Sequence, residues 1–177
     1  MEQNIGSILW FTGLSGSGKT TLATALAAKL KANGQRAYLL DGDVLRTGLC
    51  SDLKFSDKDR RENIRRAGEV AKLLMNEGYI VLCTFISPFN SDRQIVREAC
   101  PAGRFHEIYV STPLSICEER DPKGLYAKAR GGLIPLFTGI DSPYEKPVEP
   151  ELEINTNDYT IDEAVNYLLD YVLRVKL

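Results

Sequence analysis

The sequence predicts an α/β fold in which a parallel sheet of about five strands lies between layers of helices. Short apolar segments alternate along the chain with longer segments whose apolar residues recur at helical spacing. Strands that alternate with helices in this way form parallel sheets with right-handed crossovers. The 177 residues and the 44% hydrophobic content suit one domain with a sizeable core, so we expect a single domain over residues 1–177.

The expected strands are short, rich in apolar residues and bounded by turn residues. They are Ser7–Thr12, Arg36–Leu40, Tyr79–Thr84, Phe105–Val110 and Leu152–Asn155. In sheets of this kind, ligands bind at the carboxyl ends of the strands. Residues 13–20, 41–43 and 86–88 each follow an expected strand directly, so these three segments are expected to converge in space.

Two helices are expected in the first half of the chain. The first, Thr20–Asn33, carries an apolar stripe and stops at Gly34. The second follows an N-cap at Ser56, has the acidic Asp59 three residues later, and extends to about Asn76.

Three more helices are expected after the third strand. The first of them is Asn90–Ala99. Thr112 is expected to cap the next one, with Pro113 at its first position, where the missing N–H has no cost. Thr160 and Glu163 form a capping box in front of the apolar stripe of the last helix.

Residues 121–150 interrupt this alternation. The segment holds five prolines and four glycines among polar and aromatic residues. A long segment without periodicity inside a compact domain is usually a lid or a binding loop, and we expect a lid here.

Residues 13–20 carry the strongest local signal. They read Gly-Leu-Ser-Gly-Ser-Gly-Lys-Thr, which fits the phosphate-binding pattern G-x-x-x-x-G-K-[ST] between a strand and a helix. In such a P-loop the backbone N–H groups surround phosphate oxygens. Lys19 is expected to reach the β- and γ-phosphates of ATP, and the Thr20 hydroxyl to bind Mg²⁺. The expected ATP-binding residues are Gly13, Leu14, Ser15, Gly16, Ser17, Gly18, Lys19, Thr20 and Arg120.

Other polar residues near this loop have two interpretations each. Asp41 or Asp43 could hold a Mg²⁺-bound water or accept a proton from a hydroxyl, or both could be turn residues. The arginine-rich segment 60–66, with Arg46 upstream, suits a second anionic substrate, or it is a salt-bridged helix surface.

Ser87, Phe55 and Phe137 are also candidates. Ser87 follows a strand and could meet the transferred phosphoryl group, or it belongs to an ordinary strand-end turn. Phe55 and Phe137 lie in polar surroundings and could enclose a base, or they are core residues.

Composition and motifs exclude several classes of protein. The net charge of −2 argues against a nucleic-acid binder, and no apolar run is long enough to span a membrane. Residues 1–4 start no secretory signal, so a cytoplasmic location is expected. Four cysteines without a C-x-x-C pair, and the single His106, predict free thiols and no zinc site. Residues 121–124 match the D-x-x-G pattern of GTPases, but they lie in the proline-rich segment and the chain has no N-K-x-D motif.

Six ordered blocks resemble one family. They are FTGLSGSGKTTLA (11–23), LDGDVLRTGL (40–49), DLKFSDKDRRENIRRAGEVAKLL (52–74), FISPFNSDR (85–93), ERDPKGLYAKAR (119–130) and FTGIDSPYE (137–145). Together they resemble adenylyl-sulfate kinase (APS kinase), the enzyme of sulfate assimilation that makes PAPS. The resemblance spans residues 8 to about 156, and the blocks other than the P-loop are specific to that family.

The resemblance implies roles that spacing does not supply. Asp41 would be the essential carboxylate near Mg²⁺ and the acceptor hydroxyl, and Ser87 the serine described in the family as a phosphoserine intermediate. The family is usually a cytosolic homodimer. The implied adenylyl-sulfate and lid residues are Arg46, Phe55, Arg60, Asn63, Ile64, Lys123, Leu125, Tyr126 and Phe137.

The chain departs from the family pattern at five positions. They are Val44, Thr47, Cys50, Leu133 and Pro135. Val44 stands where the family usually has Asn, and with Cys50 it removes polar groups expected near the acceptor. The departures therefore concern acceptor affinity more than the type of reaction.

Taken together, the sequence predicts a P-loop kinase that transfers the γ-phosphoryl group of MgATP to the 3′-hydroxyl of adenylyl sulfate. Direct in-line transfer is expected, with Ser87 as a substrate contact, because no histidine adjoins it to activate its hydroxyl. Two alternatives are a P-loop kinase for another small metabolite and a non-catalytic nucleotide-binding subunit.

Overall fold

A five-stranded parallel sheet forms the centre of the computed structural model, which describes residues 6–175. The strands are β1 (Ser7–Thr12), β2 (Ala37–Asp41), β3 (Ile80–Thr84), β4 (Phe105–Val110) and β5 (Leu152–Ile154). Their order in the sheet is β2-β3-β1-β4-β5, and all neighbouring pairs are parallel. The predicted parallel α/β fold is therefore confirmed. The expectation of no secretory signal concerns residues 1–4, which lie outside the described part.

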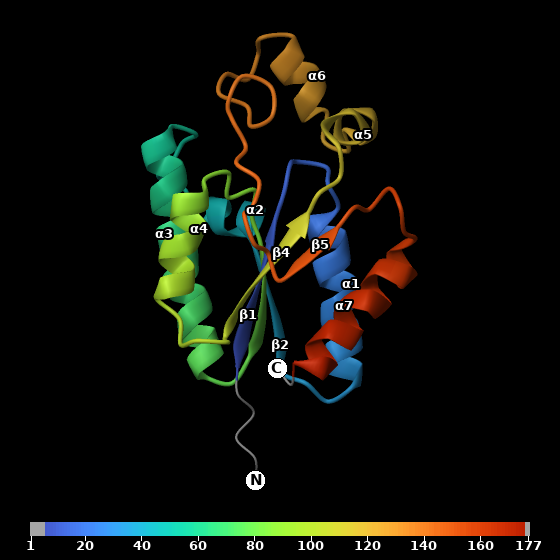
Figure 1. Ribbon diagram of the computed structural model, residues 1–177. Helices are drawn as coiled ribbons and strands as arrows, with labels where there is room; N and C mark the ends of the chain where they lie inside the picture. The colour runs from blue at the N-terminus through green and yellow to red at the C-terminus, as the bar shows by residue number, and fades with distance from the viewer. Residues whose placement is uncertain (1–5, 176–177) are drawn as a thin grey trace.

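Helices cover both faces of the sheet (Figure 1). One layer holds α3 (Asp57–Asn76) and α4 (Asn90–Glu98), and the other holds α1 (Lys19–Ala32) and α7 (Ile161–Arg174). The side chains of β1 alternate between the layers: Ile8 and Trp10 pack in the α3 and α4 core, and Leu9 and Phe11 in the other. No helix within residues 6–175 has the length and apolar character needed to cross a membrane.

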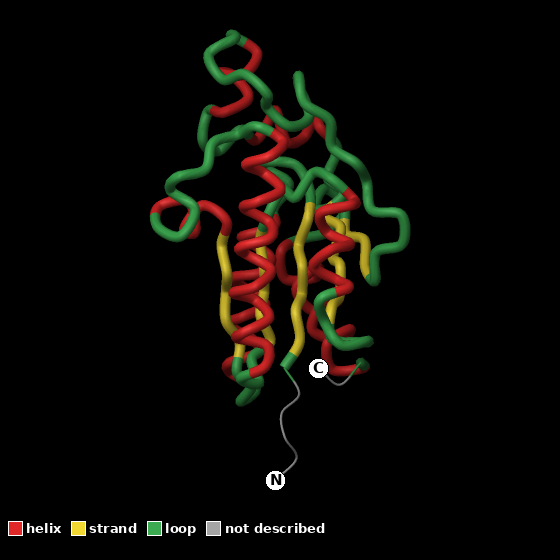
Figure 2. The backbone as a smooth tube through the Cα atoms, turned by 90° about the vertical axis from the view of Figure 1, so that its left-hand side faces the viewer, coloured by secondary structure: helices red, strands yellow, loops and turns green. Residues whose placement is uncertain are grey.

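Three short helices lie beyond the carboxyl ends of the strands. They are α2 (Gly42–Thr47), α5 (Leu114–Arg120) and α6 (Leu125–Arg130). Figure 2 shows that loops gather at this end of the sheet. Helices α2 and α6 differ from the sequence prediction, which expects a turn at residues 42–43 and an irregular segment at residues 125–130.

Local capping signals agree with the structure at two helices and differ at one. Ser56 caps α3 by accepting from the Asp59 amide, and Thr160 and Glu163 form the complete capping box of α7. The predicted cap at Thr112 is wrong, because Pro113 occupies the N-cap position of α5. The Thr112 hydroxyl instead donates to the Ser17 carbonyl at 3.0 Å, so a tertiary contact replaces the local cap.

Candidate active site

The P-loop connects β1 to α1 and depends on glycine at its two ends. Gly13 has φ +148°, and a Cβ there would lie 2.5 Å from the Val110 carbonyl oxygen. Gly18 has φ +104° and occupies the N-cap position of α1 without a side-chain cap. Gly18 has no side chain that could accept from the first N–H groups of this 14-residue helix. Those N–H groups are therefore available to bind an anion.

Lys19 lies under the same loop with only 9% of its surface exposed. Its Nζ donates to the carbonyl oxygens of Gly13 at 2.9 Å and of Leu14 at 2.6 Å. Burial lowers the pKa of Lys19 to about 8, although the carboxylates of Asp43 and Asp41 oppose that shift. A phosphate group beside Nζ would favour the charged ammonium.

Asp41 accepts hydrogen bonds from three directions. Its Oδ2 accepts from Thr20 Oγ1 at 3.0 Å and from Thr84 Oγ1 at 2.8 Å. Its Oδ1 accepts from the Asp43 amide at 2.9 Å and so caps α2. Burial alone would raise the pKa of Asp41, but these hydrogen bonds outweigh it and the pKa falls below its usual value. Asp41 is therefore a carboxylate at neutral pH.

A cavity of about 830 Å³ joins the P-loop to the ends of β2 and β3. The three segments expected to converge all contribute to its lining. So does every residue predicted for the second substrate: Asp41, Arg46, Phe55, Arg60, Asn63, Ile64, Ser87, Lys123, Leu125 and Phe137. Of the predicted ATP-binding residues, Ser15, Gly16, Gly18, Lys19 and Thr20 line this cavity, whereas Gly13, Leu14, Ser17 and Arg120 do not.

Two arginines without an ion pair face this cavity. Neither Arg46 nor Arg60 forms a salt bridge to any residue within 6–175. The guanidinium carbons lie 4.7 Å and 5.7 Å from the ring centre of Phe55, which is 52% exposed and therefore no core residue. Burial and the positive charge of Arg46 lower the pKa of Arg60. An anion in the cavity would favour the charged form of Arg60 and reduce its repulsion from Arg46.

The other arginines of the basic segment form the salt-bridged surface. Arg61 pairs with Asp92, Arg65 with Glu62, and Arg66 with both Asp52 and Glu62. The two interpretations of this segment therefore hold for different residues of the same helix.

Two buried polar atoms on cavity-lining residues have no hydrogen-bond partner among residues 6–175. They are Asn63 Oδ1 and Thr138 Oγ1, on side chains that are 5% and 2% exposed. A buried polar group without a partner costs about 1–3 kcal/mol, so a bound ligand would stabilise both. Sequence reasoning missed Thr138, although it directly follows the predicted Phe137.

The segment 121–150, which the sequence predicts to be a lid, contacts both the P-loop and the start of α2. The Tyr126 hydroxyl donates to the Ser15 carbonyl of the P-loop at 2.9 Å. The Tyr126 ring meets Phe137 edge to face, with ring centres 5.0 Å apart. Lys123 pairs with Asp43 at the start of α2. The segment therefore joins the P-loop, on one side of the cavity, to α2 on the other side.

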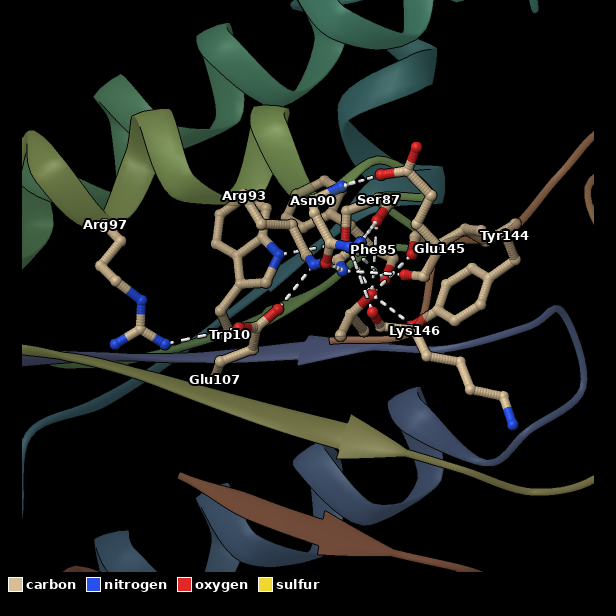
Figure 3. A network of polar contacts seen from close by, with 12 residues as sticks. Trp10, Phe85, Ser87, Asn90, Arg93, Arg97, Glu107, Tyr144, Glu145 and Lys146 are labelled. Carbon is tan, nitrogen blue, oxygen red and sulfur yellow. Dashed lines mark hydrogen bonds and ion pairs between the residues drawn. The ribbon is translucent and has the colours of Figure 1, made fainter. Parts of the chain in front are cut away.

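The Ser87 hydroxyl is directed toward β1 (Figure 3). It accepts from Trp10 Nε1 at 3.1 Å and donates to Thr12 Oγ1 at 2.9 Å, and Ser87 is 2% exposed. The Ser87 backbone has φ +40°, which is unusual for a residue with a side chain. Ser87 lines the cavity, but its hydroxyl forms buried hydrogen bonds with Trp10 and Thr12.

Similarity to known proteins agrees with this geometry. The family model for adenylylsulphate kinase matches residues 5–155. The chain belongs to the adenylylsulphate kinase family. The adenylyl-sulfate kinase of Marinobacter nauticus is 59% identical over 165 residues, which cover 93% of this chain and 83% of that protein.

Solved structures of the adenylylsulphate kinase family share the fold. The Mycobacterium tuberculosis APS kinase CysC, in complex with AMPPNP and APS, matches with a TM-score of 0.92 and 50% identity, covering 95% of this chain and 98% of that one. The hexameric APS kinase from Thiobacillus denitrificans matches with a TM-score of 0.72 and 38% identity, covering 97% of this chain and 29% of that one.

Among the positions discussed in the sequence analysis, Arg120, Val44 and Cys50 do not line the cavity. Arg120 donates to Thr156 Oγ1 at 2.7 Å, and Thr156 Oγ1 donates to the Ser17 carbonyl of the P-loop at 2.9 Å, so the binding of ATP by Arg120 stays a prediction. Val44 is 67% exposed and Cys50 is buried, and neither lines the cavity, whereas Pro135 does. The replacement of polar residues at Val44 and Cys50 therefore does not change the wall of the cavity.

Proposed function

We propose that this chain is an adenylyl-sulfate kinase, which transfers the γ-phosphoryl group of MgATP to the 3′-hydroxyl of adenosine 5′-phosphosulfate. The observation that carries the proposal is one cavity lined by the P-loop, a carboxylate and two arginines that have no ion pair within residues 6–175. The relatives named adenylyl-sulfate kinase support the same reaction. Its products are ADP and PAPS.

On the donor side, Lys19 and the N-terminus of α1 hold the phosphates of ATP. To do so, Lys19 Nζ exchanges its carbonyl partners in the loop for phosphate oxygens. The Thr20 hydroxyl and the Asp41 carboxylate, 3.0 Å apart, are the oxygen donors that Mg²⁺ prefers. Thr20 would hold Mg²⁺ through its hydroxyl and Asp41 would hold it through water, and the ion would neutralise phosphate charge when bound.

On the acceptor side, Arg46 and Arg60 hold the anionic phosphosulfate, and Asn63 satisfies its buried carbonyl oxygen through the ligand. Phe55 and Phe137 stack on the adenine. Ile64 and Leu125 complete the apolar wall, and Lys123 contributes a further positive charge from the lid.

Asp41 orients the 3′-hydroxyl for in-line attack. A carboxylate with a lowered pKa is a weak base, so it positions the nucleophile and takes the proton late, as the bond to the leaving ADP loosens. The remaining acceleration comes from holding both substrates in one geometry.

The test is ADP release from MgATP with adenylyl sulfate as acceptor. Parallel reactions contain AMP, gluconate, shikimate or no acceptor, and ³¹P NMR identifies the product. Adenylyl-sulfate-dependent release with a new 3′-phosphate is expected. Release with another acceptor only, or nucleotide binding without phosphorylation, would overturn the proposed function.

We also infer a homodimer in the cytoplasm, as the family resemblance implies. Sedimentation analysis of the purified chain gives the mass of the assembly in solution. A monomer or a hexamer would contradict the homodimer.

The Ser87→Ala variant is expected to retain kcat within about tenfold of the parent. The reason is that the Ser87 hydroxyl is occupied by Trp10 and Thr12 and has no basic side chain bonded to it within residues 6–175. Steady-state kinetics measures the change, and mass spectrometry of the parent during turnover looks for phosphate on Ser87. A loss of turnover together with a phosphoserine in the parent would favour a covalent route.

A further inference from the structure

A buried arginine behind the acceptor cavity connects one of its walls, the 86–88 turn, to the segment that follows Thr138. Arg93 in α4 is 1% exposed, and its Nε donates to Glu107 Oε1 on β4 at 2.6 Å (Figure 3). A buried guanidinium is tolerated only when it is paired and its other donors are satisfied. Glu107 supplies the counter-charge, and the remaining donors of Arg93 bond three other oxygen atoms.

These donors bind two backbone segments, of which the 86–88 turn lines the acceptor cavity. One terminal nitrogen donates to the Ser87 carbonyl, and the other donates to Asn90 Oδ1 and, at 2.9 Å, to the Glu145 carbonyl. The Glu145 amide donates to the Pro88 carbonyl at 2.8 Å. The turn at residues 86–88 and the segment that follows Thr138 are thus joined through one guanidinium.

The turn needs such support. The φ of +40° at Ser87 is strained for a residue with a side chain, and the surrounding contacts must offset that strain. The Thr12 hydroxyl, at the end of β1, donates to the Ile86 carbonyl at 2.7 Å and bonds the Tyr144 hydroxyl at 2.9 Å. Arg93 and Thr12 therefore hold the turn from its two sides, and Thr12 directly precedes the P-loop.

We propose that Arg93 is a positioning residue for the acceptor: it fixes the 86–88 turn, which lines the acceptor cavity, against the 142–146 segment, so that this wall of the cavity is formed before the substrate arrives. Arg93 does not line the cavity itself, so it acts through the backbone of Ser87 and Glu145. The identity of the acceptor rests on the proposed function, whereas the effect on the turn does not.

The kinetic test compares Arg93→Lys with Arg97→Lys. Lysine keeps the charge for Glu107 but cannot reach all of the carbonyl partners. Arg97 lies one turn further along α4 and pairs with Glu151 and Glu107, and within residues 6–175 it bonds neither the 86–88 turn nor the 142–146 segment. We expect Arg93→Lys to raise the KM for adenylyl sulfate about tenfold, since two hydrogen bonds are lost, with the KM for MgATP within about twofold. Arg97→Lys is expected to leave both KM values unchanged.

A second readout needs no substrate. Trp10 is the single tryptophan of the chain, and its indole donates to Ser87 Oγ, so its fluorescence reports where Ser87 lies. Ser87→Ala gives the emission of Trp10 without that bond. Arg93→Lys is expected to shift the emission in the same direction, and Arg97→Lys to leave it unchanged. Asn90→Ala, at a half-buried position, removes one partner of the same guanidinium and is expected to give a smaller shift.

The two readouts separate the possible failures. Equal rises in both KM values, or an emission shift without any change in the KM for adenylyl sulfate, would overturn the positioning role. Parent emission in Arg93→Lys would also overturn it. If the parent chain does not phosphorylate adenylyl sulfate, the proposed function fails, and the emission of Trp10 still decides whether Arg93 holds the turn.

Discussion

Replacing Asp41 with asparagine is expected to lower kcat by about 10²–10⁴-fold, the range found when a positioned acid–base group is lost. Asparagine keeps the size of the side chain and is an equally good N-cap, so α2 remains capped. Its amide can also exchange hydrogen bonds with the hydroxyls of Thr20 and Thr84. The variant therefore removes the negative charge of Asp41, which lies between Thr20 and the proposed acceptor, and keeps the cap and the hydrogen bonds. Steady-state kinetics with MgATP and adenylyl sulfate measures the effect.

The matched comparison is Asp43→Asn, two residues further on. Asp43 has a 71% exposed side chain and pairs with Lys123 of the lid, and an exposed pair of this kind contributes about 0–1 kcal/mol. We expect this variant to lower kcat/KM by less than about tenfold. A kcat for Asp41→Asn equal to that for Asp43→Asn would assign no special role to Asp41. Thermal unfolding of both variants checks that neither has lost its fold.

Elements whose signals are local could be predicted from the sequence. β1 and β4 have the predicted bounds because each is a short apolar segment with a sharp stop. The short helices could not be predicted this way. Helix α6 follows Gly124 at φ +63°, and Asp121 holds its first turn by accepting from the amides of Tyr126 and Ala127. Six residues in a segment rich in glycine and proline carry too little periodicity to indicate a helix.

The meeting of the site segments followed from topology, because parallel strands end at the same edge of a sheet. Thr84 belongs to the same pattern: it lies opposite Asp41 in the β2–β3 register, a signal that the sequence analysis did not use. The division of the arginines could not be predicted. Arg61 has an ion pair because Asp92 lies beside it, 31 residues away in the chain, whereas Arg60 donates to carbonyl oxygens and has no ion pair within residues 6–175. Likewise, the partner of the Ser87 hydroxyl is Trp10, 77 residues away.

Lys19→Met is expected to lower kcat by about 10²–10³-fold, the range for loss of one preorganised charge at a transferring group. Methionine fills the buried space under the P-loop, but it cannot neutralise phosphate charge. Lys29→Met is the control, because Lys29 lies on the same helix and its ammonium bonds Asn166, away from the site. Turnover of Lys19→Met within about tenfold of the parent would show that the backbone of the loop and the metal suffice without Lys19.

The pH dependence of nucleotide affinity separates the charge of Lys19 from its shape. Burial holds the pKa of Lys19 at about 8 in the free chain, below the value of 10.5 for an exposed lysine. Above pH 8 the free chain has lost this proton, and phosphate binding must take it up again. The affinity for MgATP is therefore expected to fall as the pH rises through 8, by at most about tenfold per pH unit. For folding the sign is opposite: between pH 8 and 10.5 the unfolded chain binds more protons than the folded one at this site, so the contribution of Lys19 to the free energy of unfolding rises with pH. Calorimetric titration from pH 7 to 10 measures the affinity, and Lys19→Met is expected to abolish the fall whereas Lys29→Met keeps it. A fall that persists in Lys19→Met would assign the proton to another group.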